Sequence, residues 1–273
     1  MIDVKNELRW LSPGVLPNDL KCLKIVPISD IHYGNPFFSY HHFKKTLDLL
    51  ALPEYYTILN GDLCESALKS SKGDIYHQSA SPQEQRDWVI AQFMPYKNKI
   101  LGITAGNHEA RILNETGIDI CKDIAAALHV PYRPEGILIK IQFGGGNNRV
   151  PTQPYTYYCY ATHGYGGART KSAKAVKVER LSTWIHADFY IMSHDHVVNI
   201  APDIYLMPDN RGSINSNGFL SGAITAKRKM LIKSNAYLKW GGYSEMGGFP
   251  PVDLDSVIIR LSGEGSPKVN VEA

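Results

Sequence analysis

The sequence predicts one layered α/β domain with mixed β-sheets, and three observations support this fold class. Short apolar runs alternate with helix-like stretches in the first half of the chain, which is the pattern of βαβ units. Later strand-like runs are joined by a loop rich in glycine, asparagine and proline, as in antiparallel hairpins. No internal repeat or low-complexity linker interrupts the 273 residues, so we expect a single domain over residues 1–273.

The first half of the chain contains the expected βαβ units. Leu23–Ser29 is a short apolar run that ends at Asp30, as buried strands commonly do. Ser81 followed by Pro82 is a typical helix start, because serine caps free N–H groups and proline fits the first turn. The same patterns predict strands at Tyr56–Asn60 and Ile100–Thr104, and helices at His41–Leu52, Pro82–Met94 and Ile118–Leu128.

The second half favours antiparallel strands. Ile137–Phe143 and Tyr155–Thr162 are expected to form a hairpin with Gly144-Gly145-Gly146 at its tip. That glycine run is not followed by the Gly-Lys-Ser/Thr of a phosphate-binding loop, so we assign it no ligand. Further strands are expected at Phe189–Ser193, Ile204–Met207, Gly218–Ile224 and Ser256–Leu261, and a helix at Ser172–Ile185.

The composition is that of an ordinary globular protein. Hydrophobic residues make up 44% and charged residues 20%, and the net charge of +3 is too small to indicate nucleic-acid binding by itself. No apolar run approaches the ~18 residues of a membrane span, and charged residues near the N-terminus argue against a secretory signal. We therefore expect a cytoplasmic protein without a membrane anchor, whose four cysteines are reduced.

Metal-ligand residue types follow five of the predicted strands. They occur in five short motifs: Asp30-Ile31-His32, Gly61-Asp62-Leu63-Cys64-Glu65, Gly106-Asn107-His108-Glu109, His163-Gly164 and His194-Asp195-His196. In open α/β sheets, sites are built at the carboxyl ends of strands. A mixed set of imidazole, carboxylate and amide ligands fits two adjacent divalent ions, which together can bind a phosphate and activate water.

In this order, the five motifs resemble those of the calcineurin-like metallophosphoesterases. The resemblance spans Lys24–Val197, and Tyr243–Pro251 looks like the tail of putative phosphoesterases from phages and bacteria. It implies a four-layer αββα sandwich of two mixed sheets flanked by helices. It also implies hydrolysis of a phosphate ester by attack of a metal-bridging hydroxide.

The resemblance assigns a role to each motif residue. Asp30, His32 and His196 would bind the first metal, and Asn107, His163 and His194 would bind the second, with Asp62 bridging both. The ligand set accepts manganese, iron, zinc or magnesium, and manganese is favoured. The catalytic pair would be His108 and Glu65: His108 assists the leaving group as a general acid or charge stabiliser, and Glu65 orients its imidazole and raises its pKa.

Three positions depart from the family pattern. Glu65 stands where many members have aspartate, and Ser193 precedes the final motif where glycine is common. The second motif continues as Ser66-Ala67 and lacks the Asp-Arg-Gly of Ser/Thr protein phosphatases, which counts against a protein phosphatase. The ligand residue types themselves are all retained.

The substrate is less constrained than the metal site. Arg111 and Arg169 are candidate phosphate-binding residues, with a surface position as the alternative for each. The basic residues of 169–180 and 227–233 favour a phosphodiester in a nucleotide or nucleic acid, although solvated surfaces would give the same pattern. A phosphomonoester substrate is the alternative, and a non-catalytic metal-binding scaffold is a third possibility. Asp195 is expected to face solvent or to contact the ligands.

Overall fold

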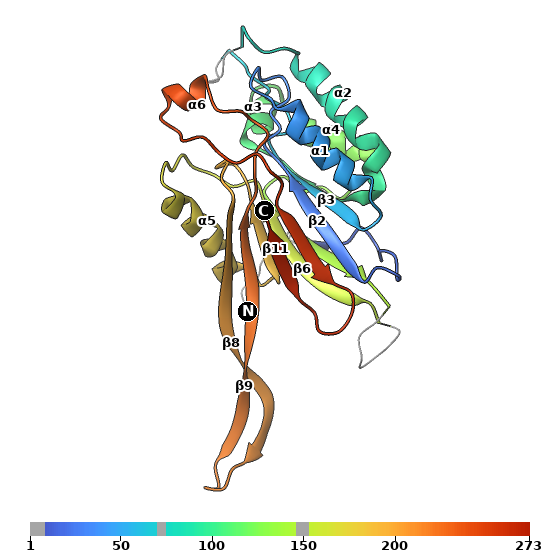
Figure 1. The fold of residues 1–273 in the computed structure, drawn as a ribbon, viewed down its shortest axis with the longest axis vertical. Helices are drawn as coiled ribbons and strands as arrows, with labels where there is room; N and C mark the ends of the chain where they lie inside the picture. Colours follow the sequence, from blue (N-terminus) through green and yellow to red (C-terminus); the bar gives the residue numbers. More distant parts are fainter. Residues whose placement is uncertain (1–8, 70–74, 146–152) are drawn as a thin grey trace.

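The computed structural model describes residues 9–69, 75–145 and 153–273, and in it two β-sheets pack face to face between helices (Figure 1). The six-stranded sheet has the order β1-β5-β6-β7-β9-β8 and the five-stranded sheet the order β11-β10-β2-β3-β4. The strands of the six-stranded sheet are β1 (Trp10–Leu11), β5 (Ile137–Phe143), β6 (Tyr155–Thr162), β7 (Phe189–Met192), β8 (Asn199–Ile214) and β9 (Leu220–Lys233). Those of the five-stranded sheet are β2 (Cys22–Ile28), β3 (Tyr55–Asn60), β4 (Ile100–Thr104), β10 (Ile258–Ser262) and β11 (Val269–Glu272).

Both sheets mix parallel and antiparallel pairs. Strands β2, β3 and β4 run parallel to one another, and so do β6, β7 and β9. Strands β5 and β6 pair antiparallel, as do β10 and β2. The predicted hairpin of β5 and β6 is confirmed, whereas part of its expected glycine tip, Gly146, lies outside the described residues. The carboxyl ends of the parallel strands therefore meet at one edge of the sandwich.

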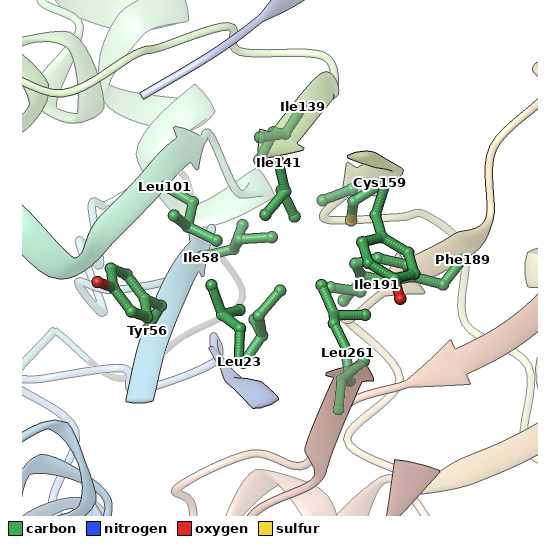
Figure 2. Close-up of a cluster of buried hydrophobic side chains, with 14 of the residues drawn as sticks. Leu23, Tyr56, Ile58, Leu101, Ile139, Ile141, Cys159, Phe189, Ile191 and Leu261 are labelled. Carbon is green, nitrogen blue, oxygen red and sulfur yellow. The ribbon is translucent and has the colours of Figure 1, made fainter. Parts of the chain in front are cut away.

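The main core lies between the two sheets. Ile25 and Ile58 of the five-stranded sheet face Ile139, Cys159 and other side chains of the six-stranded sheet, and all four are fully buried. Figure 2 shows this cluster. Strands β5 and β6 alternate buried and half-buried residues, so each presents one apolar face to the core.

Helices cover the outer faces of both sheets. The helices are α1 (Tyr40–Leu50), α2 (Pro82–Phe93), the 3₁₀ helix η1 (Met94–Lys99), α3 (Asn107–Thr116), α4 (Ile120–Leu128), α5 (Lys171–Trp184) and α6 (Tyr243–Met246). Helices α1, α2 and α4 pack on the five-stranded sheet around Phe43 and Phe93, and α5 packs on the six-stranded sheet through Val178 and Leu181. The predicted αββα order of layers is confirmed.

Three predictions of secondary structure were incomplete. Asn107–Thr116 forms α3, where no helix was expected. Glu109 stabilises the start of this helix by accepting the N–H of Gly106. Strand β11 was not expected at all. The two short strands expected at Ile204–Met207 and Gly218–Ile224 are parts of the much longer β8 and β9, which pair along most of their length.

Other expectations concern the cysteines and the membrane. All four cysteines are free, and Cys64, Cys121 and Cys159 are buried. Among the described residues, no helix has both the length and the apolar character that crossing a bilayer requires.

Candidate metal centre

The five motif loops meet at the strand ends and are tied together through their backbones. The loop after β2 pairs with the loop after β3, because Asp30 N–H donates to Gly61 O at 3.0 Å and His32 N–H to Asp62 O at 3.0 Å. The loop after β7 joins them through the N–H of His194, which donates to Asp30 Oδ2 at 3.2 Å. Residues that are far apart in sequence are thus held in one cluster.

Five of the seven predicted ligands have left-handed backbone conformations. The φ angles are +49° for Asp30, +48° for His32, +49° for Asp62, +71° for His194 and +52° for His196. Such values are uncommon for residues other than glycine, and each costs on the order of 1 kcal/mol or more. Glycine would adopt these φ angles at a lower cost in free energy. The ligand side chains at these five positions therefore lower the stability of the fold.

The first ligand cluster consists of Asp30, His32 and His196. Nε2 of His196 lies 3.0 Å from Asp30 Oδ1 and 3.3 Å from Nε2 of His32. Nε2 of His32 lies 3.8 Å from the same Asp30 oxygen. Asp30 and His32 are buried, and His196 is half-buried, so the cluster is open to solvent on the His196 side.

The second cluster consists of Asn107, His163 and His194. Asn107 Oδ1 lies 3.2 Å from Nε2 of His163 and 2.8 Å from Nδ1 of His194. The two ring nitrogens are themselves 3.3 Å apart. An amide oxygen and two imidazole nitrogens therefore converge on one point.

Asp62 lies between the clusters. Its Oδ2 is 3.2 Å from Nε2 of His163 and 3.6 Å from Nε2 of His32. Its other oxygen, Oδ1, accepts the N–H of His108 at 2.9 Å, which fixes the orientation of the carboxylate. A single carboxylate oxygen thus faces both sets of ligands, as a bridging ligand must.

Hydrogen bonds to the outer ring nitrogens orient the histidines. Nδ1 of His163 is 2.8 Å from Asn60 O, and Nε2 of His194 is 2.6 Å from Gly166 O. Because a carbonyl oxygen only accepts, each of these nitrogens donates to it, and the other ring nitrogen, which faces the centre, is the one placed to bind a metal. Nδ1 of His32 is held by the Glu65 carboxylate at 3.1 Å in the same way.

The geometry and charge of the cluster fit two divalent cations. Ligands that each lie about 2.1 Å from one ion are about 3.0–3.4 Å apart, which is close to the spacings within both clusters. Asp30 Oδ1 is buried and has no hydrogen-bond donor within the described residues, so a cation would satisfy it. Burial opposes ionisation of Asp30 and Asp62, but the surrounding histidines outweigh it and hold the pKa of both carboxyl groups well below the ordinary value.

Glu65 contacts both His32 and His108. Its carboxylate is hydrogen-bonded to His32 and lies 3.8 Å from Nδ1 of His108, and its main-chain oxygen accepts from that nitrogen at 2.6 Å. Burial lowers the pKa of His108 to about 4, although the charges of Asp62 and Glu65 act to raise it. Nε2 of His108 faces the cluster, 3.9 Å from Asp62 Oδ2.

The two candidate arginines lie in different surroundings. Arg111 is half-buried on α3, and its Nη1 lies 3.5 Å from Nδ1 of His108, so it borders the cluster. Arg169 is exposed, and its guanidinium carbon lies 5.9 Å from the centre of the Phe249 ring. Arg111 is therefore beside the predicted ligands, whereas no described contact joins Arg169 to them.

Glu109 has a structural role that the sequence analysis did not assign. It is buried on α3, and its carboxylate accepts the N–H groups of Asp62 at 3.0 Å, Cys64 at 2.9 Å and Gly106 at 3.1 Å. These bonds join the second and third motif loops. The signal in the sequence was the acidic residue three positions after Gly106, which is the spacing of a helix cap.

Asp195 is a second residue with a structural role. It is buried, so of the two positions expected for it the solvent-facing one is wrong. Its Oδ1 pairs with Nζ of Lys177 at 2.7 Å, its Oδ2 pairs with Nζ of the fully buried Lys233, and its main-chain oxygen accepts from Lys174 at 2.9 Å. Lysines from α5 and β9 thus hold the loop that carries His194 and His196. Lys174 and Lys177 are accordingly neither a phosphate-binding wall nor a solvated face.

Ser193 belongs to a buried polar network that joins the two sheets. Asn60 at the end of β3 donates to Thr162 O at 2.8 Å and is 2.6 Å from Ser193 Oγ. Ser193 in turn contacts Ser234 Oγ at 2.8 Å. The serine that replaces the usual glycine before the last motif therefore connects the strand ends on which the ligands are mounted.

A cavity adjoins the second cluster. It has a volume of about 290 Å³, and Asn107 and His163 form part of its wall. Leu113, Pro134 and Thr162 line it farther out. A substituent attached to a phosphate at the centre has room on this side.

Among known proteins, this chain is similar to solved structures only. Neither protein-family models nor curated proteins match the chain. Vacuolar protein sorting 29 from Cryptosporidium parvum is 12% identical over 93% of this chain and 98% of that chain, with a TM-score of 0.45. The calcineurin-like phosphoesterase YfkN from Bacillus subtilis is 12% identical over 92% of this chain and 90% of that chain, with a TM-score of 0.42. A predicted phosphoesterase from Streptococcus pneumoniae is 11% identical over 92% and 90%, with a TM-score of 0.39. These similarities are too distant to assign a function.

Proposed function

We propose that the chain is a metal-dependent phosphoesterase of the calcineurin-like type that binds two divalent ions and hydrolyses a phosphodiester. One observation carries this proposal: Asp62 Oδ2 lies 3.2 Å from a histidine of one ligand cluster and 3.6 Å from a histidine of the other. A shared carboxylate oxygen is the arrangement that holds two cations ~3.5–4 Å apart. A structural site for one ion would not need it.

The protein's own residues orient the reactants. Asp30, Asp62 and the histidines would bind the cations, and hydrogen bonds to Glu65, Asn60 and Gly166 fix the ring orientations. When bound, two divalent ions polarise the phosphoryl oxygens and lower the pKa of a water molecule that serves as the nucleophile. His108 and Arg111, at the border of the cluster, are placed to contact the leaving oxygen and a phosphate oxygen.

The preference for a diester is supported by the cavity of about 290 Å³ beside Asn107 and His163. A phosphodiester carries a second organic substituent, and this cavity provides space for one next to the ligands. Lys174 and Lys177 of α5 do not support a nucleic-acid substrate, because both contact Asp195. A nucleotide or nucleic-acid diester remains our preferred substrate class on the strength of the cavity and Arg111.

The substrate class is tested by comparing bis(p-nitrophenyl) phosphate with p-nitrophenyl phosphate. The protein is first freed of metal and then supplied with manganese, zinc, iron or magnesium. We expect two ions per chain by elemental analysis and a higher kcat/KM for the diester. A higher kcat/KM for the monoester would replace our substrate class with a phosphatase, and stoichiometric metal without any turnover would indicate a scaffold.

Replacing His108 by alanine is expected to lower kcat by about 10²–10⁴-fold, because a side chain that assists the leaving group is lost. Metal content should stay at the wild-type level, since the ring is not among the predicted ligands. The matched control is His41→Ala, at an exposed position on α1, which should leave kcat unchanged. Wild-type kcat in His108→Ala, measured on the diester with both ions present, would remove His108 from the mechanism.

A further inference from the structure

Strands β8 and β9 extend well beyond the sandwich as a two-stranded ribbon (Figure 1). Every residue from Leu206 to Arg228 is exposed, whereas Met230 and Ile232 at the base of β9 are buried in the core between the sheets. We call residues 204–228 the arm. A two-stranded ribbon by itself is at best marginally stable in water, so a partner surface is expected for it.

The two faces of the arm differ in polarity. Cross-strand partners share a face, and alternate residues of one strand lie on the same face. One face is therefore formed by the pairs Ile204–Arg228, Leu206–Ala226, Pro208–Ile224, Gly212–Gly222 and Ile214–Leu220. Arg228, at the base of the arm, is the one polar side chain at these paired positions. The opposite face contains the pairs Tyr205–Lys227, Met207–Thr225 and Ser213–Ser221.

The apolar face continues the inner face of the six-stranded sheet. On β9, Ile224 and Ala226 have the same parity as Met230 and Ile232, whose side chains pack in the core between the sheets. On β8, Leu206 has the same parity as Ile200, which also packs against that core. Inside the sandwich this face is covered by the other sheet; along the arm no described residue covers it.

We propose that the apolar face of the arm binds the same face of a second copy of this chain, giving a two-fold symmetric dimer. Beyond Arg228 at its base, this face is apolar, so it offers few contacts to a charged partner such as nucleic acid but is complementary to itself. The side chains of Ile204, Leu206, Ile214, Leu220 and Ile224 are 64%, 69%, 74%, 76% and 66% exposed. Exposed apolar surfaces of this extent mark interaction sites in soluble proteins.

The area is sufficient for a stable dimer. If each of these side chains buries roughly 100 Å², two arms together bury about 1,000 Å² before the backbone is counted, which reaches the range of specific interfaces. The same contact would order both ribbons, since each would then form one layer of a four-stranded sandwich. The proposal does not depend on the metal centre.

The test is the mass of the full chain in solution, measured by sedimentation equilibrium. We expect a reversible dimer, and we expect the double variant Leu206→Glu with Ile224→Glu to weaken it by at least ~100-fold in Kd, because four carboxylates would face one another. The matched control is Thr225→Glu with Ser213→Glu on the opposite face of the arm, which should leave Kd within about threefold of wild type.

Three results would overturn the proposal. They are a wild-type chain that stays monomeric at about 100 μM, a dimer that survives the apolar-face substitutions, and a dimer that is lost equally in the control. Circular dichroism and metal content report whether each variant is folded. If the glutamate variant does not fold, Leu206→Ser with Ile224→Ser provides the same test. A monomeric wild type that binds DNA or lipid vesicles through this face would assign a different partner.

Discussion

Replacing Asp62 by asparagine lowers kcat for the phosphodiester by about 1,000-fold or more and reduces the bound metal from two ions per chain to one or fewer. The substitution keeps the shape of the side chain and its acceptor for the N–H of His108, but it removes the charge that faces both ligand clusters. A loss of this size corresponds to about 4 kcal/mol of transition-state stabilisation. Elemental analysis and steady-state kinetics on the purified protein measure the two effects.

The matched control for this substitution is Asp209→Asn. Asp209 is an exposed aspartate at the irregular part of β8, on the arm and in none of the ligand clusters, and its loss should leave metal content and kcat at wild-type values. Asp62→Asn with two tightly bound ions and undiminished kcat is the result that would refute a bridging role. A chain with one ion and full activity would refute the two-metal proposal while leaving a hydrolase in place.

Replacing Lys233 by methionine is expected to lower the free energy of unfolding by about 3 kcal/mol. Lys233 is fully buried and pairs with Asp195, so its removal leaves a buried carboxylate with one charged partner, Lys177. Because Asp195 lies between His194 and His196, we also expect metal affinity to fall by about 10–100-fold, as for other residues that orient ligands. Urea unfolding and metal titration measure these changes.

A second buried lysine on the same strand provides the control. Lys229 donates to Ser182 O at 3.2 Å and lies 3.9 Å from the partly exposed Asp203, so Lys229→Met should cost at most about 1 kcal/mol and leave metal affinity unchanged. Asp195→Asn added to Lys233→Met removes the buried carboxylate that has lost one of its two charged partners and should restore part of the lost stability. Equal effects of Lys233→Met and Lys229→Met would show that the ion pair with Asp195 does not position the ligands.

The sequence motifs predicted the members of the candidate site, and the family resemblance that they carry predicted the layers. Apolar runs such as Ile100–Thr104 are long enough for buried strands and too short for helices, and five of them are followed by a motif with residues that can bind a metal. Since the carboxyl ends of parallel strands meet at one edge, motifs far apart in the chain could be predicted to converge there. The structure brings Asp30, His32, Asp62, Asn107, His163, His194 and His196 into one cluster.

Tertiary structure decided the roles of the residues that support those ligands. Glu65 was expected to orient His108, but only the fold could show that its carboxylate reaches His32 and its main-chain oxygen reaches His108. Asp195 and Lys233 carry no local pattern that distinguishes them from surface charges, and the capping pattern of Glu109 does not show that it also joins two motif loops. Their burial and partners depend on how distant loops pack, which short-range spacing does not encode.

The length of β8 and β9 was also determined by tertiary structure and not by the local sequence. Pro208 and Gly212 follow the predicted strand Ile204–Met207 and are residues typical of turns, yet β8 pairs with β9 through them with one irregularity near residues 208–212. Local patterns favour chain breaks at such residues, whereas cross-strand pairing compensates for them only when both strands are present in register. The local sequence therefore predicted that short strands exist here, and only long-range pairing determined that a largely apolar face extends past the core, where no residue of the described chain covers it.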